Sequence, residues 1–280
     1  MASAGQPAAV APAATEEKSP TSNIPKGKTE LKILMLHGYT QSGPLFSAKT
    51  KALNKLLIKA LSPAPLNLHP TLIFPSGPHR LRPSDIPGYV APEDPSHQRD
   101  DDDLDNWAWF RKDDASGSYR GLDDGMLRIA STIRDAGGVD GVLGFSQGGC
   151  MASLVASALE HPHRVSPESN SWLSELRAAN GGRPLKFCVI YSGFHATPSD
   201  LQWLFEPAIT TPTLHFLGGL DTVVEEKRSM ALVERCRDPM VLTHPGGHYV
   251  PVARDWAMQL AGWLRQRCVE ATDEEAKESL

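Results

Sequence analysis

Cysteine is scarce in this sequence and thinly spread along it. The four cysteines, Cys150, Cys188, Cys236 and Cys268, are too few and too far apart for a disulfide framework in a chain of 280 residues. None of them forms a C-x-x-C pair, the spacing typical of structural zinc sites. We therefore expect reduced thiols in a reducing compartment and a cytoplasmic protein.

Other absences exclude whole classes of protein. No apolar run reaches the ~18 residues that a membrane span needs. Lys and Arg number 28 against 33 Asp and Glu, a formal net charge of −5, which excludes a globally basic nucleic-acid binder. No G-x-G-x-x-G follows the first predicted strand, and this argues against a dinucleotide-dependent dehydrogenase.

The two ends of the chain differ in composition from the middle. Residues 1–29 are rich in Ala, Pro, Ser and Thr, contain no aromatic residue, and predict a disordered tail. Residues 270–280 hold five acids and one lysine, so we expect an acidic tail at 269–280. The folded domain is then expected at 30–268. Because the acidic tail supplies most of the net charge, this domain is near neutral, which favours uncharged substrates.

Short apolar runs alternate with segments of helical periodicity. This alternation predicts an α/β protein with a mostly parallel sheet of about six strands and helices on both faces. Strands are expected at 31–36, 72–74, 141–145, 185–191, 213–217 and 240–243, and helices at 45–61, 122–136, 147–159, 225–235 and 252–267.

A long insertion at 76–120 interrupts the alternation. It contains many prolines, an acidic run at Asp100–Asp103, and the aromatic residues Trp107, Trp109 and Phe110. Long ordered connections are often lids or binding loops, so one interpretation is a lid with aromatic substrate contacts. The alternative is an irregular insertion whose aromatics pack on the domain. The acidic run is read as a solvated loop, since nothing nearby completes a set of metal ligands.

The segment 144–148, GFSQG, matches the G-x-S-x-G motif. The motif alone is weak, and it also fits a plain glycine-rich turn. Here it lies between a predicted strand and a predicted helix, which is where a nucleophile elbow presents its serine. We therefore predict Ser146 as a nucleophile.

A serine hydroxyl needs a base, and an acid that orients the base. Two late histidines are candidates, and His248 is favoured over His244 because it follows two glycines in a loop. Pro245 to Gly247 breaks any helix that would place both rings on one zinc ion. The acid is expected just after the strand at 213–217, where Asp221 lies; its alternative role is a turn or cap residue. Asp200 and Asp238 fit less well.

An oxyanion needs N–H donors that are already in place. The residue after the nucleophile, Gln147, supplies one backbone N–H. The loop after the first strand supplies the second, and Tyr39 is its best candidate. His37, at the end of that strand, is interpreted as a structural ring rather than a base.

These motifs resemble the fungal-type serine hydrolases of the FSH family, α/β-hydrolases with relatives in animals and plants. The resemblance covers about residues 30–268, and its last segment is the most specific. The matching segments are 36–43 (LHGYTQSG), 144–149 (GFSQGG), 191–194 (YSGF), 219–224 (GLDTVV) and 244–251 (HPGGHYVP).

The resemblance implies an α/β-hydrolase fold with nucleophile Ser146, acid Asp221 and base His248. It also implies hydrolysis of carboxylic esters or thioesters, with no metal or organic cofactor. Some fungal relatives resemble thioesterases that release polyketide chains, so an acyl carrier domain is a candidate partner. A non-catalytic binding scaffold is the alternative from another class.

The substrate is expected to be a small-molecule acyl ester or thioester with a medium or long chain. Four aromatic residues are candidates for an apolar acyl pocket, and their alternative role is ordinary core: Trp107, Trp109, Phe110 and Phe194.

Overall fold

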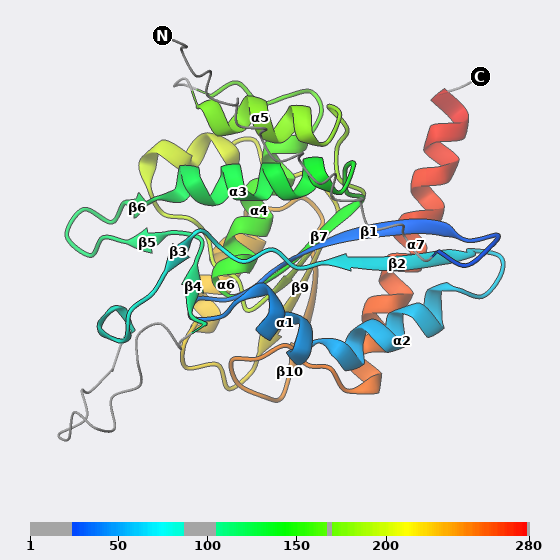
Figure 1. Cartoon of the computed structure of the whole chain (residues 1–280), viewed down its shortest axis with the longest axis horizontal. Coiled ribbons are helices and arrows are strands. Elements are labelled where there is room, and N and C mark those ends of the chain that lie inside the picture. The colour runs from blue at the N-terminus through cyan, green and yellow to red at the C-terminus, as the bar shows by residue number, and fades with distance from the viewer. Residues whose placement is uncertain (1–23, 87–104, 167–169, 279–280) are drawn as a thin grey trace, which may run out of the picture.

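A parallel six-stranded sheet forms the centre of the computed structural model, which describes residues 24–86, 105–166 and 170–278 (Figure 1). Its strand order is β10-β9-β8-β7-β1-β2, and every neighbouring pair is parallel. The predicted α/β architecture of about six strands is therefore confirmed. The strands are β1 (Thr29–Leu36), β2 (Leu68–Ile73), β7 (Gly141–Phe145), β8 (Phe187–Tyr191), β9 (Thr213–Gly218) and β10 (Met240–His244).

Helices cover both faces of this sheet (Figure 1). Strand β1 shows why, because its alternate side chains face two separate apolar clusters. Leu34 and Leu36 pack with α3, α4, α5 and α6, whereas Ile33 and Met35 pack with α1, α2 and α7. The helices are α1 (Gly43–Lys49), α2 (Lys51–Leu61), α3 (Leu122–Asp135), α4 (Gln147–Leu159), α5 (Ser171–Ala179), α6 (Glu226–Val233) and α7 (Arg254–Glu278).

Two of the predicted helices differ from the structure by more than two residues or by a break. The segment 45–61 is two helices rather than one, because the backbone leaves the helical region at Thr50 (φ −100°, ψ 9°) and the Thr50 hydroxyl donates to the Phe46 carbonyl. The last helix was expected at 252–267, but α7 continues to Glu278. It therefore includes 269–278, where an acidic tail was expected.

Strand β2 is longer than predicted because Pro70 does not interrupt it. Proline has no N–H to give to a neighbouring strand, so inside a sheet it is tolerated at an edge. Strand β2 is the last in the strand order and pairs only with β1, where Pro70 lies opposite Leu31.

The insertion predicted at 76–120 contains local structure of its own. Strand β3 (His79–Arg80) pairs with β4 (Trp107–Ala108), β5 (Arg111–Lys112) pairs with β6 (Tyr119–Arg120), and a short 3-10 turn spans Pro83–Asp85. The acidic run at 100–103 lies outside the described residues, as do most of the N-terminal stretch and residues 279–280.

The sheet determines where a functional site can form. In a parallel sheet, the loops that follow the strands all emerge at the same edge. The loops after β1, β7, β8, β9 and β10 therefore meet there, and they carry Tyr39, Ser146, Phe194, Asp221 and His248. None of the helices in the described part of the chain combines the length and apolarity that a bilayer-spanning segment requires.

A buried ion pair anchors the segment that leads into β9. Glu160, at the end of α4, accepts from the backbone N–H of Thr211 at 2.6 Å and pairs with Arg164 at 2.6 Å. The Arg164 guanidinium also donates to the carbonyls of Pro207 and Ala208. Both charged side chains are only 6% exposed, so each depends on the other for its charge partner.

Replacing Arg164 by Met is expected to lower the free energy of unfolding by about 3 kcal/mol, because the Glu160 carboxylate stays buried without its cation. Arg134→Met is the matched control, because it breaks an Arg–Glu pair with Glu175 in which both side chains are half exposed. The control should cost less than about 1 kcal/mol. Urea unfolding measures both, and equal losses would contradict the role given to the buried pair.

Candidate active site

Ser146 lies on a sharp turn between β7 and α4. Its backbone has φ 55° and ψ −116°, a conformation that residues other than glycine rarely adopt. Two glycines make the turn possible. A Cβ on Gly144 would lie 2.0 Å from the Gly148 carbonyl oxygen, and a Cβ on Gly148 would lie 2.1 Å from the Leu36 carbonyl oxygen. The predicted elbow geometry is therefore present at Ser146.

The structure brings together three side chains that are far apart in the sequence. The Ser146 hydroxyl lies 2.9 Å from His248 Nε2, where it can donate a proton. On the other side of the ring, His248 Nδ1 lies 2.7 Å from Asp221 Oδ2. The Phe145 ring lies 4.8 Å from the imidazole and packs against it. The arrangement can remove a proton from the hydroxyl while a carboxylate orients the imidazole.

Asp221 is held by the backbone of its own loop as well as by His248. Its Oδ1 accepts from the N–H groups of Val223 and Val224, both at 2.9 Å. Partial burial alone would raise the pKa of Asp221, but the hydrogen bonds from His248 and Val224 outweigh it and hold the pKa below its usual value. The carboxylate therefore stays ionised beside the imidazole. Asp221 thus also stabilises its own turn, which is the alternative role predicted for it, and this role coexists with the hydrogen bond to His248.

The less favoured candidates for the base and the acid, His244, Asp200 and Asp238, lie away from Ser146. His244 is the buried last residue of β10, where it packs against Tyr249 and Trp256 and accepts from the Gly246 N–H. Asp200 lies in the 3-10 helix Ser199–Leu204, and Asp238 lies in the turn before β10. None of the three hydrogen-bonds to Ser146 in the described part of the structure. The described residues also contain no group of three or more His, Cys, Asp or Glu that could hold a metal ion.

The two expected oxyanion donors line the same cavity as Ser146. Tyr39 belongs to the loop after β1, and Gln147 is the first residue of α4. Strand β4 holds the Tyr39 loop in place: the Thr40 N–H donates to the Trp107 carbonyl, and the Trp107 N–H donates to the Gln41 carbonyl, both at 3.1 Å.

The Gln147 side chain has a role that the sequence reasoning missed. Its Oε1 accepts from the Trp109 N–H at 2.8 Å, and its Nε2 donates to the Phe110 carbonyl at 2.9 Å. The Trp109 indole in turn donates to the His37 carbonyl at 2.9 Å. Two side chains, Gln147 and Trp109, thus join the elbow, the insertion and the residue that follows β1. The only signal in the sequence was a glutamine directly after the predicted nucleophile.

His37 is structural, as expected. Its Nδ1–H donates to the Gly38 carbonyl, and its Nε2 accepts from the Gly77 N–H at 2.9 Å. Burial lowers the pKa of His37 to about 4, so the ring is neutral at physiological pH. A neutral ring is required here, because a protonated Nε2 could not accept the hydrogen bond from Gly77.

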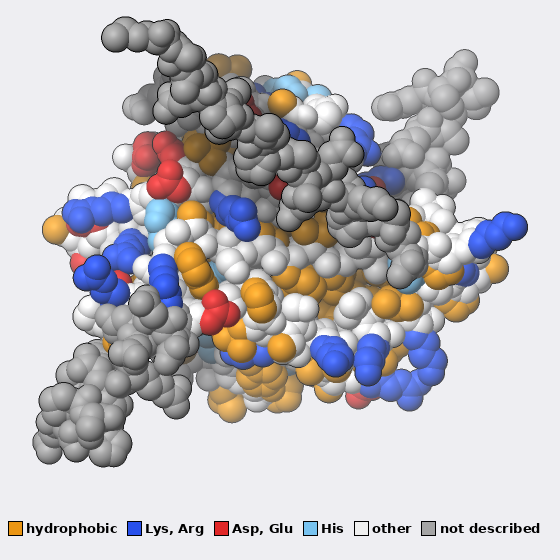
Figure 2. All heavy atoms as spheres, viewed as in Figure 1, with side chains coloured by type: hydrophobic (Ala, Val, Ile, Leu, Met, Phe, Trp, Pro, Cys, Tyr) orange, Lys and Arg blue, Asp and Glu red, His pale blue; other side chains and the backbone are white. Residues whose placement is uncertain are grey.

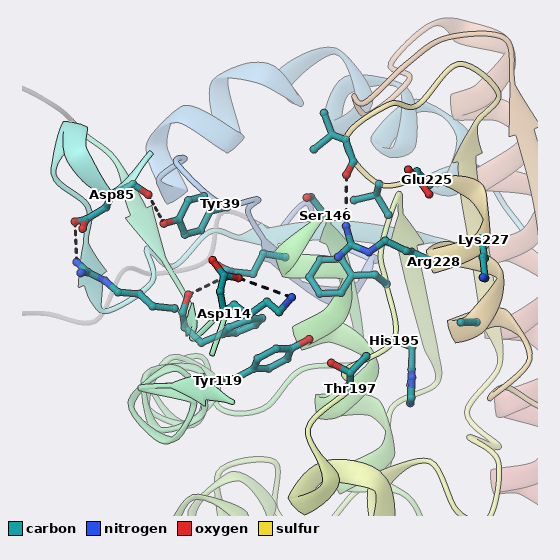
Figure 3. Close-up of a pocket in the computed structure, with 18 residues that line it drawn as sticks. Tyr39, Asp85, Asp114, Tyr119, Ser146, His195, Thr197, Glu225, Lys227 and Arg228 are labelled. Atoms are coloured by element: carbon teal, nitrogen blue, oxygen red, sulfur yellow. Dashed lines mark hydrogen bonds and ion pairs between the residues drawn. The ribbon is translucent and has the colours of Figure 1, made fainter. Parts of the chain in front are cut away.

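Two cavities lie beside Ser146 and His248. The larger, of about 920 Å³, contains Ser146, Tyr39, Gln147, Phe110 and Phe194 among its lining residues (Figure 3). The smaller, of about 270 Å³, is lined by Gln41, Phe46, Lys49, Phe145, His248, Tyr249 and Val250.

The four predicted aromatic contacts divide into two groups. Phe110 and Phe194 line the larger cavity, and the Tyr119 ring stacks on Phe110 at 4.0 Å. Trp109 is completely buried and Trp107 donates to Asp105, and neither lines a described cavity. Trp109 is therefore enclosed by the protein, whereas substrate contact by the partly buried Trp107 stays a prediction.

The larger cavity is also more charged than the near-neutral domain suggested. Seven charged residues line it: Asp85, Arg111, Lys112, Asp114, Glu225, Lys227 and Arg228. Lys and Arg side chains also gather on the surface near β5 and β6 (Figure 2). These positions have no shared sequence pattern, and only the fold brings them together.

A family model described as serine hydrolase (FSH1) matches residues 27–260. The chain belongs to this serine hydrolase family. The resemblance seen in the motifs is confirmed, and together with family members named as esterases it indicates ester hydrolysis as the general activity of this hydrolase.

Several known proteins resemble the hydrolase. It is 30% identical over 252 residues to Esterase OVCA2 of Danio rerio, covering 84% of this chain and 97% of that protein. It is 28% identical over 237 residues to Family of serine hydrolases 2 of Saccharomyces cerevisiae, with coverage of 84% and 97%. A Schizosaccharomyces pombe protein named dihydrofolate reductase is 33% identical over 232 residues, and the match covers 79% of this chain but 44% of that protein.

A solved structure supports the fold. Zea mays acyl-protein thioesterase 2 superposes with a TM-score of 0.51 at 20% identity, covering 87% of this chain and 96% of that one. The predicted α/β-hydrolase fold is therefore confirmed.

Substituting Gly148 by Ala is expected to destabilise the hydrolase by about 2 kcal/mol and to lower its esterase activity, because the new Cβ overlaps the Leu36 carbonyl and pushes α4 away from β1. Gly262→Ala on α7 is the matched control, since a Cβ there has nothing within 4 Å. That change should stabilise the protein by up to about 1 kcal/mol through helix propensity. Thermal unfolding and an ester assay compare the two, and an unaffected G148A would contradict the tight contact.

Proposed function

We propose that the hydrolase cleaves carboxylic esters or thioesters through an acyl-enzyme intermediate on Ser146. The observation that carries the proposal is the continuous pair of hydrogen bonds from Ser146 to His248 and from His248 to Asp221, at 2.9 and 2.7 Å. The Ser146 residue lies in the wall of the larger cavity, where a carbonyl group can reach it.

The proposed reaction has two halves. Ser146 attacks the carbonyl carbon while His248 takes the hydroxyl proton, and Asp221 stabilises the resulting imidazolium. The backbone N–H groups of Tyr39 and Gln147 bind the oxyanion. His248 then gives its proton to the departing alcohol or thiol. In the second half, a water molecule activated by His248 cleaves the acyl-enzyme and restores the serine.

The two cavities suggest how an ester lies across the site. The leaving atom receives its proton from His248, so the leaving group must depart on the His248 side. His248 lines the smaller cavity, and both proposed oxyanion donors line the larger one together with Ser146. We therefore assign the acyl chain to the larger cavity and the leaving group to the smaller.

The larger cavity supports an acyl chain longer than acetyl. Its volume of about 920 Å³ far exceeds that of an acetyl group, and Phe110, Tyr119 and Phe194 give it apolar surface. Delivery of a thioester by an acyl carrier domain stays a prediction from the family resemblance.

A fluorophosphonate probe tests the nucleophile, because it phosphonylates an activated serine. The wild-type hydrolase should be labelled, and Ser146→Ala should not. Ser153→Ala is the matched control: this serine lies on the same helix, is buried, and donates to the Cys150 carbonyl.

Asp221→Asn should fold normally and lose about 10³- to 10⁴-fold in kcat, as expected when an imidazole loses its orienting carboxylate. A folded wild type that neither labels nor hydrolyses esters would favour the non-catalytic scaffold instead.

A panel of p-nitrophenyl esters from acetate to decanoate tests the acyl assignment. kcat/KM should rise from acetate to the medium chains, because each methylene that leaves water for the cavity contributes about 0.8 kcal/mol at most. Phe194→Ala should flatten this rise, while Tyr249→Ala in the smaller cavity should leave its slope intact. A maximum at acetate would count against the proposed pocket.

A further inference from the structure

Among the residues that the structure describes, one arginine of the proposed acyl cavity has no carboxylate within ion-pair distance. The Arg228 side chain extends from α6 towards the middle of the cavity in Figure 3. Its guanidinium carbon lies 4.7 Å from the centre of the Phe194 ring, and its Nη1 donates to the Val223 carbonyl at 3.4 Å. A ring below and a carbonyl at one side orient the guanidinium before any ligand arrives.

In the described part of the chain, four of the other charged residues of the cavity form ion pairs with one another, unlike Arg228. Arg111 pairs with Asp85 at 3.2 Å, and Lys112 pairs with Asp114 at 4.0 Å. Across the described residues, no carboxylate lies within ion-pair distance of Arg228 or of its neighbour Lys227. In Figure 3, Lys227 lies farther from Ser146, so Arg228 is the inner unpaired cation.

We propose that Arg228 binds a carboxylate at the far end of the acyl chain, so that the favoured substrates are monoesters or thioesters of dicarboxylic acids. The proposal rests on the reaction proposed above, because it uses the assignment of the acyl chain to the larger cavity.

The chemistry of the cavity favours a carboxylate over other groups. Guanidinium presents its N–H donors in a plane that matches the two oxygens of a carboxylate. A carboxylate carries a single charge that Arg228 alone balances, whereas a phosphate dianion would need a second cation, and Lys227 lies farther from Ser146. The rings of Phe110, Tyr119 and Phe194 contact the methylenes between the ester and the carboxylate. The cavity therefore has an apolar wall with one cationic group, the Arg228 guanidinium, beside it.

The test compares two esters of equal length. Mono-p-nitrophenyl adipate carries a free carboxylate on the acyl side, and its methyl-capped form is neutral; release of p-nitrophenolate reports both. In the wild type, the ratio of kcat/KM values should favour the carboxylate. Arg228→Met keeps a long aliphatic side chain at this position and should lower this ratio about fivefold to tenfold, the size of an ion pair partly screened by solvent. Arg228→Lys keeps the positive charge but lacks the planar guanidinium, so its ratio should lie between those of the wild type and Arg228→Met.

Arg134→Met is the control, because it removes a cation that does not line the larger cavity. Its ratio should equal that of the wild type. An equal ratio in Arg228→Met and the wild type, or an equal fall in both variants, would overturn the proposal. So would a preference that appears only when the carboxylate is on the alcohol, which 4-carboxyphenyl hexanoate measures against its methyl-capped form.

A binding measurement separates this proposal from the proposed reaction. If no ester is hydrolysed by the wild type, the proposed reaction fails, and calorimetry with adipate then tests Arg228 by itself. Adipate should bind the wild type and bind Arg228→Met about fivefold to tenfold more weakly. Equal binding, or none to either protein, would overturn the carboxylate site.

Discussion

The positive-φ turn at Ser146 is the constraint on which the other features of the site depend. A serine in this conformation is strained, and it persists only where its surroundings leave no alternative. The surroundings here are two backbone contacts too close for any side chain, at Gly144 and Gly148, which press α4 against β7 and β1. Because α4 is buried along its whole length, the helix cannot move to relieve the strain. The elbow therefore presents the Ser146 hydroxyl at the edge of the sheet, where the later loops arrive.

The insertion between β2 and α3 is part of the site's framework rather than an addition to it. The Gln147 side chain binds the backbone at Trp109 and Phe110, and the Trp109 indole binds the residue that follows β1. Strand β4 also pairs with the loop that carries Tyr39. The elbow and the Tyr39 loop are thus held at one separation by hydrogen bonds through the insertion. Such a framework is useful for donors that must be in position before charge develops on a substrate.

The larger cavity differs in character from the pocket that composition suggested. A near-neutral domain favoured uncharged substrates, yet four cations and three acids line the cavity. Two of the cations are balanced by neighbouring acids, so the net charge of the chain conceals a local arrangement in which Arg228 faces the cavity with no carboxylate partner among the described residues. Net charge averages over the whole surface, whereas recognition of a substrate depends on the few groups that its chain can reach.

Periodicity and local motifs were sufficient to predict the sheet, the strand–helix turn at Ser146, and Asp221 and His248 as candidates. Each of these predictions used only the residues next to the position in sequence. The break at Thr50, the burial of Trp109 and the contacts of Gln147 were not predictable in this way, because each depends on residues brought close by folding. An aromatic or glutamine side chain has the same local pattern whether it faces a substrate or the core. Only the packing of the insertion against β1 and α4 distinguishes these cases, and the same packing leaves Phe110 in the cavity wall while Trp109 is enclosed.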